Sequence, residues 1–135
     1  MDCVFCKIAA GEIPSHKVYE DDDTLAFLDI APVSCGHILV VPKKHFQNME
    51  DIPEDELSKL IKTVKKAGKA VKDGLAVAGY NANVNNNPVA GQVIPHIHFH
   101  IIPRVEGDGL KLWPQSKYGE GEAEEALRKI KNCIR

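Results

Sequence analysis

His96-Ile97-His98-Phe99-His100-Ile101-Ile102 sets three of the chain's six histidines at alternate positions, with apolar residues between them. Side chains two residues apart on a β-strand point from the same face, roughly 6.5–7 Å from one another. The spacing therefore predicts a strand that carries imidazoles on one face and core residues on the other. Imidazole serves in proton transfer, metal binding and nucleophilic attack near neutral pH. A row of three is costly for stability alone, so we expect the function to lie here.

The segment before this strand is rich in amides and glycine. Asn85-Asn86-Asn87-Pro88 and Gly91-Gln92 offer amide donors and exposed backbone next to the imidazoles. Backbone N–H groups and a glutamine amide can hold an anionic oxygen such as a phosphoryl oxygen. Asparagine, proline and glycine are also ordinary turn residues, so the asparagines fit a purely structural role as well.

Composition excludes several classes of protein. The 135 residues suffice for one domain with its own core, and 44% hydrophobic with 27% charged residues is typical of a globular domain. A formal net charge of −2 argues against a general nucleic-acid binder. No apolar run approaches a membrane span and the N-terminus has no signal-peptide core, so we expect no membrane partner and a cytoplasmic location.

Periodicity and turn residues predict an α+β fold with five strands in a mainly antiparallel meander sheet. The expected strands are 18–20, 24–29, 37–41, 77–85 and 96–102. A first helical turn or two is expected over 4–10, one long helix over 53–74 and a short C-terminal helix over 122–130. We treat 1–135 as a single domain in which about 107–135 form a C-terminal tail and helix.

The long helix has the clearest signals. It opens at Pro53 with three acidic residues beside the positive end of the helix dipole, and Gly74 ends it. Its apolar stripe has a 3.6-residue period with lysines opposite, and comprises Leu57, Leu60, Ile61, Val64 and Val71. One such helix covers only part of one sheet face, so either loops or a second subunit must cover the rest.

Two of the four cysteines form the pair Cys3-Val-Phe-Cys6. This spacing is typical of a metal knuckle or a redox pair, and a structural zinc site would need two further ligands from elsewhere. The other two, Cys35 and Cys133, have no assigned role.

The chain resembles the histidine triad (HIT) superfamily of nucleotide hydrolases and transferases. The segment His96 to Ile102 matches its His-φ-His-φ-His-φ-φ signature, where φ is an apolar residue. Further segments resemble the same family in the same order: Val4-Phe5-Cys6-Lys7-Ile8, Glu12-Ile13-Pro14, Tyr19-Glu20-Asp21, Leu25-Ala26-Phe27-Leu28-Asp29 and the run from Gly36 to His45.

The resemblance implies a two-fold homodimer of five-stranded antiparallel sheets, joined by the long helix and a strand. It also implies cleavage at the α-phosphate of purine nucleoside monophosphate conjugates through a nucleotidyl-histidine intermediate. The middle histidine, His98, would be the nucleophile. His100 and His37 would orient it and bind phosphoryl oxygens, and Gln92 would contact the phosphoryl region.

The same resemblance implies a nucleotide pocket for AMP or GMP. Asp29 would accept two ribose hydroxyls, and Asn85 would contact the ribose or phosphate. The purine would lie against apolar side chains, which as large apolar residues also fit an ordinary core: Phe5, Phe27, Ile30 and Leu39.

Members with an N-terminal Cys-x-x-Cys resemble a zinc-containing branch, in which two histidines complete a closed set. Here the ligands would be Cys3, Cys6, His45 and His96, holding one structural zinc per chain with no organic cofactor. One position departs from the family pattern. Members that cleave phosphoramidates carry Ser or Thr after Gly-Gln, where a hydroxyl can protonate an amine, whereas this chain has Val93.

Two other functions fit parts of the pattern. The HxHxH motif could bind a catalytic zinc whose water attacks the substrate. Alternatively, the chain could be a nucleotide sensor or adaptor without catalysis. A metal requirement for turnover distinguishes the first, and AMP binding without turnover distinguishes the second.

Overall fold

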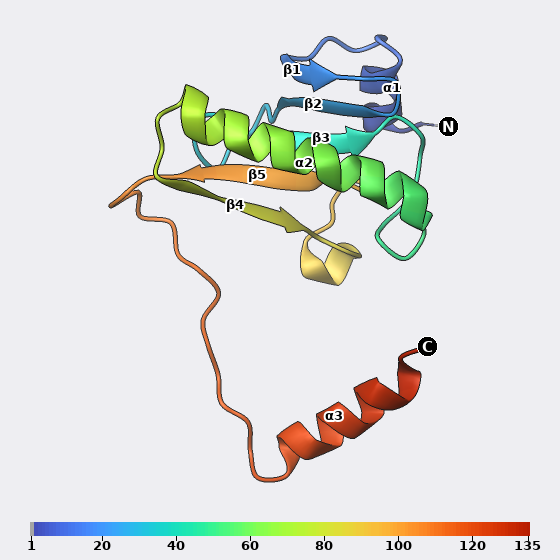
Figure 1. Ribbon diagram of the computed structural model, residues 1–135, viewed down its shortest axis with the longest axis vertical. Helices are drawn as coiled ribbons and strands as arrows, with labels where there is room; N and C mark the ends of the chain where they lie inside the picture. Colours follow the sequence, from blue (N-terminus) through green and yellow to red (C-terminus); the bar gives the residue numbers. More distant parts are fainter. Residues whose placement is uncertain (1) are drawn as a thin grey trace.

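The computed structural model describes residues 2–135, which form five strands, three α-helices and one short 3-10 helix (Figure 1). The strands are β1 (Lys17–Glu20), β2 (Thr24–Leu28), β3 (Ile38–Pro42), β4 (Gly79–Val84) and β5 (Phe99–Arg104). The helices are α1 (Val4–Ala9), α2 (Glu54–Gly74), η1 (Pro88–Ala90) and α3 (Glu122–Cys133). This confirms the predicted α+β class and every predicted helix and strand, with shifts at their ends.

The sheet is antiparallel throughout, but its strand order is β1-β2-β3-β5-β4, so the predicted meander is wrong. The cause is the connection through α2. It leads from β3 to the edge of the sheet, and leaves the place beside β3 free for β5. The β4–β5 hairpin then folds back and inserts β5 between β3 and β4. As a result, the histidine strand lies inside the sheet, paired on both sides.

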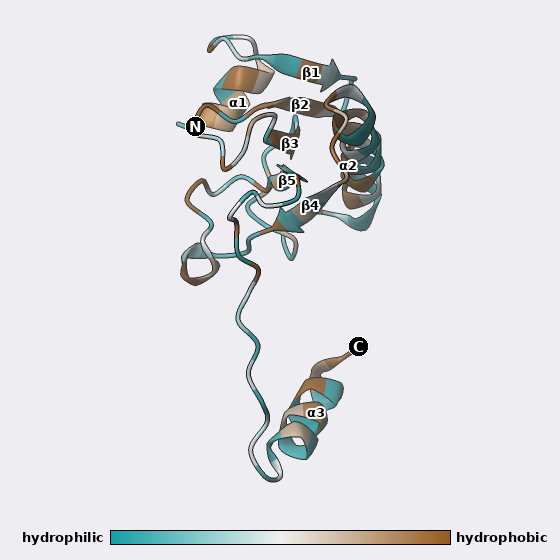
Figure 2. Ribbon diagram, turned by 90° about the vertical axis from the view of Figure 1, so that its left-hand side faces the viewer, coloured by the Kyte–Doolittle hydropathy of each residue, from teal (hydrophilic) through white to brown (hydrophobic). Residues whose placement is uncertain are grey.

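Each face of the sheet has its own core. Figure 2 shows α2 on one face and α1 on the other. Beneath α2, apolar residues of the inner strands pack with the helix stripe: Ala26, Ile38, Val40, Leu60, Val64, Val71, Phe99 and Ile101. Beneath α1, a smaller cluster contains Phe5, Ile8, Leu25, Phe27, Leu39 and Val41. Because α1 is short, it leaves the β5–β4 part of this second face without a helix.

Most of the predicted stripe of α2 faces the sheet, but Ile61 is 46% exposed. The ring of Tyr80 on β4 lies so close to Gly68 that an added Cβ would lie 2.5 Å from it. The helix therefore approaches β4 closely at this glycine.

The predicted strand 96–102 begins later than expected, because β5 starts at Phe99. Before that point the backbone pairs with a loop: the N–H of Ile97 donates to the carbonyl of Phe46 at 2.7 Å. Within β5 the alternation is as predicted, since Phe99, Ile101 and Pro103 are buried and the intervening residues are partly exposed. His96 and His98 therefore lie in the segment that leads into the strand.

Beyond β5, an extended segment leads to α3, which lies apart from the body of the molecule in both ribbon views (Figures 1 and 2). None of the residues of α3 is buried. Within residues 2–135, no helix combines the length and apolar character needed to cross a membrane.

Candidate active site and metal site

The histidines lie on the sheet face that α1 covers in part. In the sheet register His100 sits between Leu39 of β3 and Asn83 of β4. His98 packs edge-on against Phe5 of α1 with ring centroids 5.0 Å apart, and its ring lies 4.9 Å from that of His100. The two imidazoles therefore stand side by side between α1 and the β4 edge.

The backbone fixes the tautomer of His98. Its Nδ1 lies 2.8 Å from the carbonyl oxygen of His96. A carbonyl can only accept, so Nδ1 carries the proton and donates it. In the neutral ring the lone pair is then on Nε2, which is the atom required for attack on phosphorus.

A second hydrogen-bonded chain orients His100. The backbone N–H of Val33 donates to Nδ1 of His37 at 3.0 Å, so the proton of neutral His37 is on Nε2. That Nε2–H donates to Nδ1 of His100 at 2.9 Å, which leaves the proton of His100 on its own Nε2. Gly36 allows this turn: its φ is +90°, and a Cβ there would lie 2.3 Å from Leu75.

All three imidazoles are neutral at physiological pH. Burial lowers the pKa of His37 and of His98 below the ordinary value. Burial, with repulsion from His98 and His37, lowers the pKa of His100 to about 4. The approach of Asp29 Oδ2 to His37 Nε2, at 3.8 Å, is therefore not an ion pair at neutral pH.

These shifts predict the pH dependence. A nucleophilic histidine with an ordinary pKa of about 6.5 would be mostly protonated below that pH, whereas burial lowers the pKa of His98, and we therefore expect the acid limb of kcat/KM below 6.5. The free energy of unfolding changes in the same direction: it decreases as the pH falls. For His100, whose pKa in the folded protein is about 4, the unfolded chain binds more protons between about pH 6.5 and 4, so the contribution of this ring to stability is complete above about pH 6.5 and is lost toward pH 4. The pH profile of kcat/KM measures the acid limb, and denaturant titrations at pH 7 and 5 measure the change in stability. An acid limb at 6.5 or above would contradict the lowered pKa of the nucleophilic histidine.

The structure brings most of the predicted nucleotide-binding residues to this side of the sheet. Oδ1 of Asp29 accepts the Ala31 N–H at 2.9 Å, which orients the carboxylate beside His37. Phe5, Phe27 and Leu39 are buried within one cluster, with the two phenylalanine rings packed edge-on 5.7 Å apart. In contrast, Ile30 is 96% exposed.

Gln92 is buried and its amide is used within the loop. Its Oε1 accepts the Asn87 N–H at 2.8 Å, and its Nε2 donates to the carbonyls of Gln47 and Ile94 at 2.6 and 3.1 Å. These bonds hold the loop before the histidines. The side chain of Asn85 lies beside Gly91, whose φ is +96°.

The four predicted metal ligands converge. The ligand atoms of Cys3, Cys6, His45 and His96 all lie within 4.8 Å of one another. The shortest separations are 3.2 Å between the Nδ1 atoms of His45 and His96 and 3.4 Å for both Cys3–His96 and Cys6–His45. A tetrahedral zinc, with Zn–S about 2.3 Å and Zn–N about 2.0–2.1 Å, sets neighbouring ligand atoms about 3.3–3.8 Å apart. The donor set therefore fits zinc, whereas Cys35 and Cys133 are exposed free thiols.

The orientation and protonation of the ligands also fit a zinc site. Nε2 of His96 donates to the Pro42 carbonyl at 2.9 Å, so the lone pair on Nδ1 points to the cysteines. Burial lowers the pKa of His96 to about 4, and burial together with the neighbouring Cys3 raises the pKa of the Cys6 thiol. Zinc binds cysteine as the thiolate, so a bound cation would favour the deprotonated form of Cys6 against this shift.

Sequence reasoning missed the groups that fix the imidazoles. The Val33 N–H and the Pro42 carbonyl are backbone atoms, so no side-chain pattern marks them. The Ser34 hydroxyl, which donates to the Pro103 carbonyl at 2.8 Å, ties the loop of Val33 to β5. Only the Ser34-Cys35-Gly36 turn before His37 could have indicated this loop.

Fold and site together define an α+β protein with a histidine-centred site beside a Cys2His2 cluster. The model of the HIT domain matches residues 10–107, and the chain belongs to this family. The chain is 52% identical over 132 residues to an uncharacterized HIT-like protein of Methanocaldococcus jannaschii, covering 96% of this chain and 98% of the relative.

Two further relatives have named activities. The chain is 44% identical over 118 residues to an adenosine 5′-monophosphoramidase of Candida albicans, covering 83% of this chain and 78% of the relative. It is 38% identical over 134 residues to an adenylylsulfatase of Arabidopsis thaliana, covering 99% of this chain and 68% of the relative.

Solved structures agree with the fold. A HIT family protein from Bacillus subtilis superposes with a TM-score of 0.91 at 38% identity, covering 100% of this chain and 99% of the other. A zinc-bound histidine triad family protein from Mycobacterium smegmatis superposes with a TM-score of 0.79 at 33% identity, covering 99% of both chains.

Proposed function

We propose that the protein is a nucleotide hydrolase that cleaves at the α-phosphate of purine nucleoside monophosphate conjugates. The observation that carries this proposal is the neutral His98 ring, whose Nδ1–H is bound to the His96 carbonyl so that Nε2 is unprotonated. Relatives named adenosine 5′-monophosphoramidase and adenylylsulfatase support the same chemistry. The conjugates in question are phosphoramidates, dinucleoside polyphosphates and nucleotidyl adducts.

The reaction proceeds in two displacements. The Nε2 lone pair of His98 forms a P–N bond as the bond to the leaving group breaks, giving a nucleotidyl-histidine intermediate. Water then attacks the phosphorus, the electron pair returns to Nε2, and one proton passes to solvent. The Nε2–H of His100, set by His37, is positioned to donate a hydrogen bond to a phosphoryl oxygen in both steps.

The nucleoside lies on the β2–β3 side of the histidines. Asp29 accepts the two ribose hydroxyls, since an ionised carboxylate offers two acceptor oxygens. The purine lies over the cluster of Phe5, Phe27 and Leu39, with Ile30 as the exposed wall, and Asn85 reaches the ribose or phosphate. Gln92 acts as a positioning residue, because its amide holds the loop that precedes the histidines.

Cys3, Cys6, His45 and His96 would hold one structural zinc per chain. When bound, it would stabilise the fold and neutralise the thiolates, and a closed set of four protein ligands would give it a structural role. His96 connects the two sites, because its Nδ1 faces the cysteines and its carbonyl fixes the tautomer of His98. Cysteines that bind a metal must be reduced, which fits a reducing compartment. We therefore propose a cytoplasmic location.

A catalytic zinc on the HxHxH motif fits the geometry poorly. His96 turns to the cysteines, and Nδ1 of His98 is committed to a carbonyl. Asp29, His37 and His100 do form a second cluster. A metal on His37 Nε2 would move its proton to Nδ1, where it would face the N–H of Val33.

We propose that two copies pair about the β4 edge. Among the described residues β4 is the last strand of the sheet, and its Tyr80 is 36% exposed. Ile61 of α2 and Leu75 at the end of that helix are each 46% exposed. An unpaired edge strand flanked by apolar side chains favours pairing with a second copy.

The dimer is testable by light scattering with size-exclusion chromatography. We expect a dimer mass for the wild type and a monomer mass for Ile61→Asp, because the aspartate would lose hydration at the interface. Lys62→Asp, on the solvent face of α2, is the matched control and should stay dimeric. A monomeric wild type at all concentrations would contradict the pairing.

The test of the function is AMP release from adenosine 5′-phosphoramidate, adenosine 5′-phosphosulfate and a diadenosine polyphosphate. A mild chelator that leaves a buried zinc in place is included in a parallel series. Turnover that survives the chelator supports the proposal. If the chelator abolishes activity while the protein stays folded, and added zinc restores it, the zinc-dependent hydrolase is favoured. AMP binding without turnover would favour a nucleotide sensor.

A further inference from the structure

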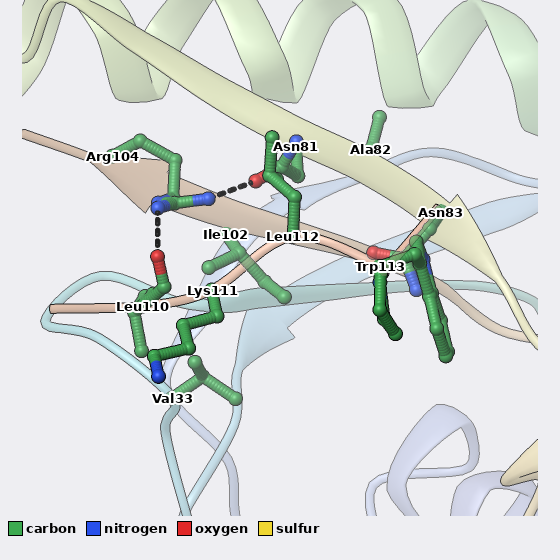
Figure 3. Close-up of a pocket in the computed structure, with 11 residues that line it drawn as sticks. Val33, Asn81, Ala82, Asn83, Ile102, Arg104, Leu110, Lys111, Leu112 and Trp113 are labelled. Atoms are coloured by element: carbon green, nitrogen blue, oxygen red, sulfur yellow. Dashed lines mark hydrogen bonds between the residues drawn. The ribbon is translucent and has the colours of Figure 1, made fainter. Parts of the chain in front are cut away.

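Two cavities differ in the chemistry of the residues that line them. The larger, of about 380 Å³, lies between the tail and strands β4 and β5 (Figure 3), and its lining within residues 2–135 includes no cysteine or histidine. The smaller, of about 330 Å³, is lined by Asp2, Cys3, Val4, His45, Ile94 and Pro95. Two of the four candidate metal ligands therefore border the smaller cavity.

The smaller cavity leads from solvent to the cysteine pair. Val4, Ile94 and Pro95 contribute apolar groups to its wall. Cys3 is only 7% exposed and belongs to the cluster beneath α1, so bulky reagents are kept from it. A small uncharged oxidant such as hydrogen peroxide fits the cavity and meets Cys3 at its wall. A cysteine that binds zinc is a thiolate, which is the form that reacts with peroxides.

The two sulfurs are close enough to react with each other. The ligand atoms of the Cys3, Cys6, His45 and His96 cluster all lie within 4.8 Å of one another. The N–H of Lys7 donates to the carbonyl of Cys3 at 3.1 Å, so Cys3 and Cys6 belong to one helical turn. Side chains three residues apart in such a turn are neighbours, and a disulfide would need their Cβ atoms to approach by roughly 1–2 Å.

Two contacts connect this turn to the nucleophilic histidine. Phe5, which lies between the cysteines in the sequence, packs edge-on against the rings of His96 and His98, with centroids 5.8 and 5.0 Å apart. Nδ1 of His96 lies 3.4 Å from the sulfur of Cys3, and the carbonyl of His96 accepts the Nδ1–H of His98 at 2.8 Å. A change in the cysteine pair therefore displaces groups that orient His98.

We propose that Cys3 and Cys6 form an oxidative modification site for a hydroperoxide that enters through the smaller cavity. Oxidation joins the two sulfurs, removes them from the metal cluster and lowers the rate of nucleotide cleavage. The effect on cleavage rests on the proposed function, whereas the modification itself rests on the cysteine pair and the cavity.

The modification takes two steps with hydrogen peroxide. The Cys3 thiolate attacks one peroxide oxygen, the O–O bond breaks, and Cys3 becomes a sulfenic acid as hydroxide leaves. The Cys6 thiolate then attacks the sulfur of Cys3, the S–O bond breaks, a disulfide forms and a second hydroxide leaves. The sulfurs lose two electrons, which the peroxide oxygens gain, and two protons from solvent convert the hydroxides to water. Only the two imidazoles then remain as ligands, so zinc passes to solvent.

The test uses zinc-loaded protein with Cys35→Ser and Cys133→Ser, so that Cys3 and Cys6 are its only cysteines. Hydrogen peroxide is added, a chromogenic chelator reports released zinc, thiols are counted after denaturation, and mass spectrometry of the digest detects a bridge between the two cysteines. We expect one zinc to be released for each bridge formed, and kcat for AMP release to fall about tenfold in parallel. Dithiothreitol with added zinc should restore both the metal content and kcat.

The route through the cavity is tested separately. Val4 lines the cavity and is 38% exposed, so Val4→Trp narrows the cavity from its surface side. Ala10→Trp, at an exposed position after α1 and outside the cavity lining, is the matched control. At one peroxide concentration we expect Val4→Trp to slow zinc release about fivefold, because access limits the reaction, and Ala10→Trp to leave its rate unchanged.

Retention of zinc and of both thiols, at a peroxide concentration that oxidises the exposed Cys35 of the wild type, would overturn the inference. Equal rates of zinc release from Val4→Trp and Ala10→Trp would overturn the cavity as the route, and a bridge that leaves kcat unchanged would overturn the link to the active site. Failure of the reduced, zinc-loaded protein to release AMP would instead contradict the proposed function, and the zinc and thiol measurements would still decide the modification.

Discussion

Replacing His98 with alanine is expected to lower kcat for AMP release at least about 10⁴-fold. The reason is that Nε2 of His98 supplies the electron pair for the new bond to phosphorus, and no other described imidazole presents an unprotonated nitrogen to the same place. Nδ1 of His100 accepts from His37, and His96 faces the cysteines. The measurement is steady-state AMP release, with AMP affinity determined by calorimetry to show that the pocket is intact.

The matched control is His16→Ala, which removes an exposed imidazole from the segment before β1. It should retain wild-type kcat and KM, because no described contact joins the His16 ring to the site. A His98→Ala protein that keeps more than about a tenth of wild-type kcat would show that another group attacks the phosphorus.

Replacing Cys3 with serine is expected to cause the largest loss of stability. Structural zinc sites contribute apparent binding free energies of about 10–16 kcal/mol in small zinc peptides, and the ligand here is 7% exposed in the core beneath α1. Loss of even a few kcal/mol lowers the Tm of a domain of this size by about 10–20 °C. We expect zinc content to fall from about one per chain to near zero, as measured by mass spectrometry of the metal.

Cys35→Ser is the control, because Cys35 is an exposed free thiol outside the cluster. It should retain both zinc and Tm. The Cys3→Ser protein should also lose activity at temperatures where it remains folded, since His96 carries both the metal contact and the carbonyl that binds His98. A Cys3→Ser protein with wild-type zinc content and Tm would contradict the metal site.

The sequence predicted what local patterns can encode. The alternation from His96 to Ile102, the Cys3–Cys6 spacing and the acidic start of the helix at Pro53 are short-range signals. The class of fold, the helices and the convergence of Cys3, Cys6, His45 and His96 agree with the structure. The last of these depended on the resemblance, because ligands 93 residues apart leave no local trace.

What the sequence could not predict is set by non-local pairing and by backbone atoms. The insertion of β5 between β3 and β4 depends on where α2 delivers the chain, and strand periodicity is the same in either order. The tautomers depend on the N–H of Val33 and the carbonyl of His96. The amide of Gln92 could have faced either a substrate or its own loop, and only the structure shows the second.

The covalent role of His98 is tested most directly by trapping the intermediate. The protein is mixed rapidly with excess adenosine 5′-phosphosulfate, quenched in alkali to preserve a P–N bond, digested and analysed by mass spectrometry. We predict one adenylyl group on the peptide that contains His98, formed before AMP is released and absent from His98→Ala. AMP release with no adduct, or an adduct on another side chain, would contradict the account.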